Sequence, residues 1–232
     1  MRTCDTMNGE VSICGRKIGR GHRTEFALSV TDVLDAQGIG QRIDMVAERT
    51  SGLNCFGTVC VRDDLHSPEA FAETVGIVSA IWDGGIILES SEAASVVSAM
   101  PAVADLKPLV CGLDALSASM VASMFGCPVA VRSQSTEELL DFVHDAGTDE
   151  VVLDPGFANI KSVLENATDL HRLAERIPEA DHPIMVKAWS GEYAVSMASL
   201  AVLRYCSLAV VDDLDRDGCE VLDRLSMSAG ER

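Results

Sequence analysis

The amino-acid sequence predicts a single (β/α)8 barrel. Its length of 232 residues suits one such barrel. From residue 24 onward, eight short apolar runs alternate with amphipathic stretches. Each run is continuously apolar, as expected of a strand buried on both faces. The alternative is an open doubly wound sheet, but no Gly-x-Gly-x-x-Gly motif follows the first run, and this absence favours the barrel.

The predicted strands are rich in β-branched residues, and the segments between them have helical periodicity or capping signals. Ile160–Ile177 places its apolar residues on one stripe, which predicts a long helix. Ser67-Pro68-Glu69 and Ser135 with Glu138 have the residue types that begin helices. The predicted strands are Glu25–Val30, Gly57–Val61, Gly85–Leu88, Pro108–Cys111, Pro128–Val131, Glu150–Leu153, Pro183–Val186 and Leu208–Val211.

The segments outside the repeat are short. Turn signals at Asn8-Gly9-Glu10 and Gly15-Arg16 predict a small β-hairpin within residues 1–23, lying over the closed, N-terminal end of the barrel. The barrel is expected to occupy residues 24–225. Residues 226–232 are polar and are expected to form a frayed tail.

Charge and composition exclude several classes of partner and of site. Lys and Arg number 18 against 36 Asp and Glu, so the net charge of −18 disfavours nucleic acid and anionic membranes. No run of about 18 apolar residues predicts a membrane span, and the first 23 residues lack a signal-peptide core. The eight cysteines lack metal-ligand spacing, so we expect a reduced, cytoplasmic protein with no metal site.

Polar residues follow nearly every predicted strand. Because a barrel's active site lies at the C-terminal ends of its strands, these side chains are expected to share one rim. For each aspartate, the alternative is that it caps the following helix. The residues are Asp32, Arg62, Asp63, Glu89, Ser90, Asp114, Arg132, Gln134, Asp154, Lys187, Asp212 and Asp213.

The most distinctive rim segment is Asp154-Pro155-Gly156, which follows the buried run Val151–Leu153. Asp154, with Asn159 nearby, is suited to hydrogen-bond a ring rich in N–H groups, such as a pterin. Alternatively, Asp154 braces its own turn. Arg132 and Lys187 are suited to bind a carboxylate or phosphate, or alternatively to pair with acidic residues of the rim.

Several short segments occur in an order and spacing similar to those of one family. They are Val59–Arg62 with Ser67–Ala72, Lys107–Val110, Gly126–Arg132 with Ser135–Leu139, Val151–Gly156, and Ala201–Tyr205 with Leu208–Val211. Together they resemble the barrel of the corrinoid iron–sulfur protein large subunit, the gamma subunit of the acetyl-CoA decarbonylase/synthase complex. Gly9–Gly15 and Gly21–Phe26 resemble the beginning of that barrel, and the resemblance spans about residues 8–220.

The resemblance implies a role in the one-carbon metabolism of the reductive acetyl-CoA pathway. The family's large subunit also has a four-cysteine domain holding a [4Fe–4S] cluster and a C-terminal domain holding cobalamin, and this sequence shows neither. The implied function is a scaffold or partner in methyl transfer to acetyl-CoA synthase, with no cofactor bound in its own chain. The implied partner is the small-subunit barrel or a corrinoid protein, as a heterodimer with cobalamin at the interface.

Two other functions remain open. Related barrels in pterin methyltransferases bind methyl-tetrahydropterin at the mouth. By that resemblance, Asp114, Asp154 and Asn159 would hold the pterin, and a separate corrinoid protein would take the methyl group. The chain would then be a methyltransferase, although no catalytic residue is assigned. A third possibility is an unrelated barrel enzyme acting on a small metabolite, with a metal or phosphate at the rim.

Overall fold

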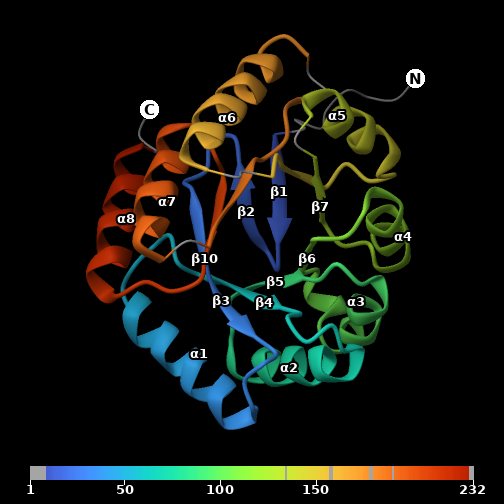
Figure 1. The fold of residues 1–232 in the computed structure, drawn as a ribbon, viewed down its shortest axis with the longest axis vertical. Coiled ribbons are helices and arrows are strands. Elements are labelled where there is room, and N and C mark those ends of the chain that lie inside the picture. The colour runs from blue at the N-terminus through green and yellow to red at the C-terminus, as the bar shows by residue number, and fades with distance from the viewer. Residues whose placement is uncertain (1–8, 134, 157–158, 178–179, 190, 230–232) are drawn as a thin grey trace.

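The computed structural model describes residues 9–133, 135–156, 159–177, 180–189 and 191–229. A hairpin of β1 (Glu10–Ile13) and β2 (Arg16–Gly19) precedes eight parallel strands alternating with helices (Figure 1). The strands are β3 (Glu25–Thr31), β4 (Thr58–Arg62), β5 (Gly85–Glu89), β6 (Leu109–Cys111), β7 (Val129–Arg132), β8 (Val151–Asp154), β9 (Met185–Ala188) and β10 (Leu208–Val211). Each lies within two residues of its predicted bounds.

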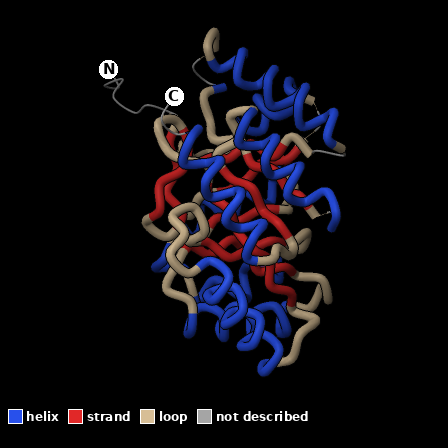
Figure 2. Tube along the Cα trace, turned by 90° about the vertical axis from the view of Figure 1, so that its left-hand side faces the viewer, coloured by secondary structure: helices blue, strands red, loops and turns tan. Residues whose placement is uncertain are grey.

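The helices form a ring around the strands, as Figure 2 shows from the side. They are α1 (Ala36–Thr50), α2 (Pro68–Ile81), α3 (Ala93–Ala99), α4 (Ala115–Phe125), α5 (Thr136–Asp145), α6 (Ile160–Ala174), α7 (Ala194–Leu203) and α8 (Arg216–Ala229). Short 3-10 turns cover Met100–Ala102, Ala104–Leu106 and Gly191–Tyr193. In the described part of the chain, none of these helices is long and apolar enough to cross a membrane.

The sheet closes on itself. Its strand order is β8-β7-β6-β5-β4-β3-β10-β9, and every pair is parallel. The last gap, between β8 and β9, is bridged by one parallel pairing of Leu153 with Ile184. The predicted (β/α)8 barrel is therefore confirmed.

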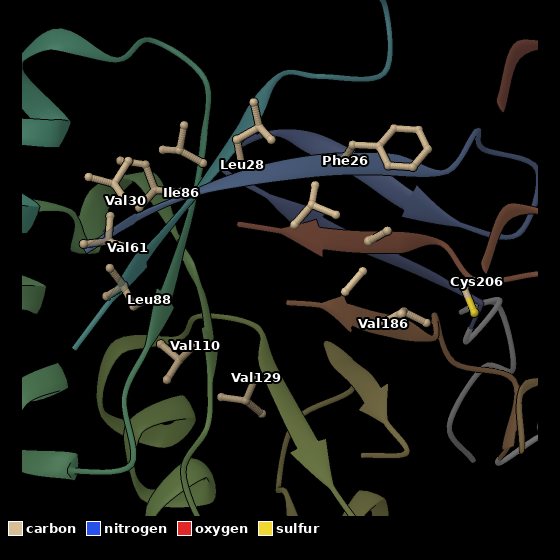
Figure 3. Packing of buried hydrophobic residues seen from close by; sticks show 14 of the residues in the cluster. Phe26, Leu28, Val30, Val61, Ile86, Leu88, Val110, Val129, Val186 and Cys206 are labelled. Carbon is tan, nitrogen blue, oxygen red and sulfur yellow. The ribbon is translucent and has the colours of Figure 1, made fainter. Parts of the chain in front are cut away.

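Two apolar cores lie on the two sides of the strands. Phe26, Leu28 and Val30 of β3 face outward and pack against the ring of helices (Figure 3). Inward-facing strand residues form the second core. Val11, Ile13 and Ile18 of the hairpin complete it at the N-terminal end of the barrel. Burial on both faces explains why the strands read as continuous apolar runs.

The hairpin is fixed to the N-terminal ends of the strands. Arg16 Nε and Nη2 donate to the two carboxylate oxygens of Glu25, the first residue of β3, at 2.9 and 3.0 Å. Cys14 N donates to Lys107 O at 3.2 Å, just before β6. A Cβ on Gly57 would lie 2.1 Å from Arg16 Cζ, so a larger residue there would displace the Arg16 guanidinium from its position beside Glu25. The predicted hairpin over the closed end is confirmed.

The C-terminal end differs from expectation. Helix α8 continues to Ala229, so the predicted frayed tail is wrong for residues 226–229, and residues 230–232 lie outside the described residues. Ser226 is fully buried, and its Oγ donates to Thr24 O at 2.9 Å. The polar composition of this segment predicts exposure, but Ser226 finds a hydrogen-bond acceptor inside the protein.

The variant Glu25→Gln tests how much the hairpin anchor contributes to stability. It removes the charge that Arg16 contacts but keeps the shape of the side chain, so we expect the free energy of unfolding to fall by about 2 kcal/mol. For a domain of this size, that corresponds to a melting temperature about 4–8 °C lower. The control Glu10→Gln alters the exposed pairs with Lys17 and His22 and should change the free energy of unfolding much less. Equal losses in the two variants would contradict the anchoring role.

Candidate functional site

The C-terminal ends of the strands bring charged side chains together at the barrel mouth. Cys60 and Val152 point into the barrel. Because side chains alternate along a strand, Arg62 and Asp154, two residues further on, point the same way. Glu89, Arg132, Lys187 and Asp212 join them through the ion pairs and hydrogen bonds of the mouth. The mouth is therefore a ring of alternating charges above an apolar interior.

Lys187 is the centre of this ring. Its Nζ donates to Glu89 Oε1 at 2.8 Å and lies 3.3 Å from Asp154 Oδ2, and its side chain is only 7% exposed. Burial alone would lower the pKa of Lys187, but the acidic groups of Cys111, Asp154 and Glu89 outweigh it and raise the pKa. Lys187 is thus a fixed cation rather than a proton acceptor.

Asp154 has two roles, one for each carboxylate oxygen. Oδ1 accepts from the N–H of Gly156 at 3.0 Å, which braces the turn after β8. Oδ2 faces Lys187 and lies 3.9 Å from Arg132 Nε. Within the described residues, this buried oxygen has no hydrogen-bond partner of good geometry. The turn-bracing role is therefore present, and the other oxygen is buried beside Lys187.

Asp114 and Asn159 cap helices beside the mouth. Asp114 Oδ1 accepts from Ser117 N at 3.0 Å, and its hydrogen bonds to Ser117 lower the pKa of Asp114. Asn159 Oδ1 accepts from Ser162 N at 3.0 Å, and Ser162 Oγ bonds back to the Asn159 N–H in a capping box. Among the described residues, no ion pair or hydrogen bond joins either side chain to Lys187. Gln134, another predicted rim residue, lies outside the described residues.

Trp189 is a mouth residue that the sequence prediction missed. The Arg62 guanidinium lies 4.5 Å from the centroid of its ring. Arg62 also donates to Asp212 Oδ1 at 2.6 Å and to Asp64 Oδ1 at 2.9 Å. The available signal was spacing, since Trp189 follows Lys187 by two residues and so falls on the same inward face.

Two further aspartates brace the loops at the ends of β3 and β4. Asp32 Oδ1 accepts from the N–H groups of Asp64 and Leu65, and Asp63 Oδ2 accepts from Ser90 Oγ at 2.6 Å. Burial, with Asp63 adding to it, raises the pKa of Asp32 despite its backbone hydrogen bonds. These rim residues hold the loops in place and are almost fully buried.

The described cysteines are free thiols, and most are buried. Burial raises the pKa of Cys55, Cys127 and Cys219 to about 11. Cys60 lies within the barrel, where its Sγ donates to Glu89 Oε2 at 3.7 Å. Among the described residues, no group of three or more His, Cys, Asp or Glu is arranged to hold a metal ion. The mouth instead offers fixed charges and hydrogen-bonding groups.

The variant Lys187→Met tests the central cation. It leaves Glu89 and Asp154 buried without their counter-charge, so we expect the free energy of unfolding to fall by about 3–5 kcal/mol at neutral pH. The loss should shrink in acid, because a carboxyl group that has taken up a proton no longer needs a counter-charge. Urea unfolding at several pH values measures both effects. The control Lys161→Met breaks only the exposed pair with Glu165. A loss for Lys187→Met that does not depend on pH would contradict the electrostatic explanation.

Comparison with known proteins identifies the family. Residues 10–229 match the family described as the CO dehydrogenase/acetyl-CoA synthase delta subunit. A curated relative, the corrinoid/iron-sulfur protein large subunit of Moorella thermoacetica, is 26% identical over an alignment covering 79% of this chain and 46% of that protein. The chain thus spans about half the length of that relative.

Solved structures with the same fold include several dihydropteroate synthases. The Yersinia pestis enzyme with a pterine-sulfa conjugate has a TM-score of 0.70 at 14% identity, covering 94% of this chain and 99% of that one. The Coxiella burnetii enzyme with pteroic acid has a TM-score of 0.72 at 10% identity, covering 96% and 99%. At these identities the likeness shows the fold alone. Since the family match spans nearly the whole barrel, the chain belongs to the CO dehydrogenase/acetyl-CoA synthase delta subunit family.

Proposed function

We propose that this barrel is a scaffold or partner subunit in methyl transfer to acetyl-CoA synthase. Membership of the CO dehydrogenase/acetyl-CoA synthase delta subunit family supports a role in one-carbon metabolism. The partner is a corrinoid protein or a small-subunit barrel, bound as a heterodimer. Cobalamin in this scheme is carried by the partner and meets this chain at their interface.

The observation that carries the proposal is an uncharged outer wall formed by α3 and α4, which pack against each other (Figure 1). Ala93–Ala104 and Ala115–Cys127 contain no charged residue, although 23% of the whole chain is charged. Helices on the outside of a barrel ordinarily turn a charged or polar face to water. A wall without charges is suited to a protein partner, because no charged group has to lose its water there.

Exposed apolar side chains lie along this wall. Leu116, Met120 and Met124 of α4 are 82%, 45% and 58% exposed and follow one another at a spacing of four residues. That spacing places them on one face of the helix. Contiguous exposed apolar surface is typical of a protein interface, and methionine adapts its shape to a partner. We define Leu116, Met120 and Met124 as the α4 stripe.

The variant Met120→Glu tests the α4 stripe. A charge at its centre should weaken association with the corrinoid protein of the same cell by roughly ten-fold or more, because the carboxylate would be desolvated without a partner. Co-purification of the tagged chain, followed by a binding titration, measures this effect. The control Val221→Glu introduces the same charge at a 52% exposed apolar site on α8 and should bind normally. If no corrinoid or acetyl-CoA pathway protein co-purifies with the native chain, the scaffold role is wrong.

A second candidate function is a pterin-binding methyltransferase, and Asp154 favours it. Its Oδ2 lies 3.3 Å from Lys187 Nζ and has no hydrogen-bond partner among the described residues, so it is suited to accept from an N–H group of a pterin. Arg132 and Lys187 would add positive charge, and Asp114 and Asn159 would flank the ring from the adjoining helix starts. A bound methyl-tetrahydropterin supplies the methyl group. These residues bind and orient the ring, and a separate corrinoid protein accepts the methyl group.

The variant Asp154→Asn tests this second candidate by calorimetry with methyl-tetrahydrofolate, with and without free cobalamin. Loss of the carboxylate acceptor should weaken binding by about 1.5–3 kcal/mol. The control Asp141→Asn changes an exposed aspartate of α5 and should bind as the native chain does. Absence of binding heat for the native chain in both conditions would exclude pterin binding.

A further inference from the structure

A cavity lies at the closed end of the barrel, opposite the mouth. Its volume is about 360 Å³, within the range of small-molecule sites. It is lined by Thr24, Ile184 and Ser207, which come directly before β3, β9 and β10, so it lies at the N-terminal ends of these strands. The end of the hairpin, α6, and the ends of α7 and α8 complete its walls. Neither proposed function uses this cavity.

In the described walls of this cavity two arginines stand against one aspartate, in contrast to the acidic excess of the protein as a whole, so we call it the cationic cavity. Arg20, His22, Arg23, His171 and His182 line it, whereas Asp181 is the one acidic residue among its described lining. Arg20 pairs with Asp181 at 3.3 Å. Arg23 has no ion pair to any residue in the described part of the chain. In a chain with a net charge of −18, a cationic cavity marks a place suited to an anion.

Tyr205 provides an independent observation at the same cavity. It follows α7 at φ +67°, a left-handed conformation that strongly favours glycine at this position of a helix end. Cys206 N donates to Ala201 O at 3.0 Å, which completes the helix-ending turn. A bulky side chain held in this conformation carries backbone strain, and such strain concentrates at ligand sites.

The Tyr205 ring is also arranged for recognition. It is 57% exposed and stacks on the His171 ring, with centroids 3.8 Å apart and planes 9° from parallel. Leu170, Ile184 and Val202 add apolar surface to the same cavity. The cavity thus combines cationic groups with a flat aromatic and apolar wall.

We propose that this cavity binds a small phosphate ester that carries a flat ring. Arginine guanidinium groups bind phosphate through charge-assisted hydrogen bonds, and Arg23 is available to do so. The stacked pair of Tyr205 and His171 offers the surface that a planar group packs against. Because the site lies at the opposite end from the mouth, the proposal holds whichever function the mouth performs.

Phenyl phosphate is the probe, because it joins a phosphate to a flat ring and nothing else. Calorimetric titration of the full chain should show saturable binding of one molecule per chain. The variant Arg23→Gln should weaken this binding by roughly ten-fold, as expected for one charge-assisted contact. The control Arg224→Gln makes the same charge change on α8, at a residue outside the cavity lining, and should leave binding unchanged.

The variant Tyr205→Gly distinguishes the contribution of the Tyr205 ring to ligand binding from its contribution to stability. Glycine is preferred at that backbone position, so the melting temperature should stay the same or rise. The affinity for phenyl phosphate should fall by several-fold, while the weaker affinity for inorganic phosphate should not change. Three results would overturn the proposal. The first is no saturable binding at millimolar phenyl phosphate, and the second is binding that Arg23→Gln does not weaken. The third is that phenyl phosphate and inorganic phosphate bind with equal affinity and that Tyr205→Gly changes neither affinity.

Discussion

The closure of the barrel at its N-terminal end depends on one buried carboxylate. Glu25 accepts two hydrogen bonds from Arg16 of the hairpin and two more from Gly57 N and Thr58 Oγ1 of the neighbouring strand region. It therefore joins the hairpin to β3 and β4 at once. With the hairpin in place, Val11, Ile13 and Ile18 complete the lower interior. The apolar core inside the barrel is therefore completed at the N-terminal end of the strands. The interior at the C-terminal end, the mouth, can carry charged side chains.

The charged side chains at the mouth determine what the candidate site can do. Lys187 lies between Glu89 and Asp154 and holds its proton firmly, so it neutralises the mouth without serving as a base. The described mouth also lacks a cluster of metal ligands. What it offers is a set of fixed charges, among them the buried Oδ2 of Asp154, which has no hydrogen-bond partner among the described residues. Such a mouth is suited to holding or facing a molecule through fixed charges and hydrogen bonds.

The sequence predicted the strands and the hairpin well, because burial on both faces and turn residues leave local signals. It did not separate ligand-facing residues from helix caps at the rim. Asp114 and Asn159 follow strands just as Asp154 does, yet each is satisfied by an N–H group three residues downstream. Long-range partners were also invisible. The buried Ser226 donates its hydroxyl hydrogen bond to Thr24 O, 202 residues away in the sequence. No local pattern could therefore show that Ser226 is buried and that α8 continues through it.

The three unusual surfaces of the barrel are separated from one another. The uncharged wall of α3 and α4 lies on one side of the ring, and α7 and α8 lie on the other (Figure 1). The cationic cavity is bounded by α6, α7 and α8 at the closed end, whereas the mouth lies at the opposite end of the strands. A partner bound to the α4 stripe would therefore leave the cavity accessible. Because the α4 stripe and the described cavity lining share no residue, the effects of variants at the two sites should add, and their ligands can be tested independently.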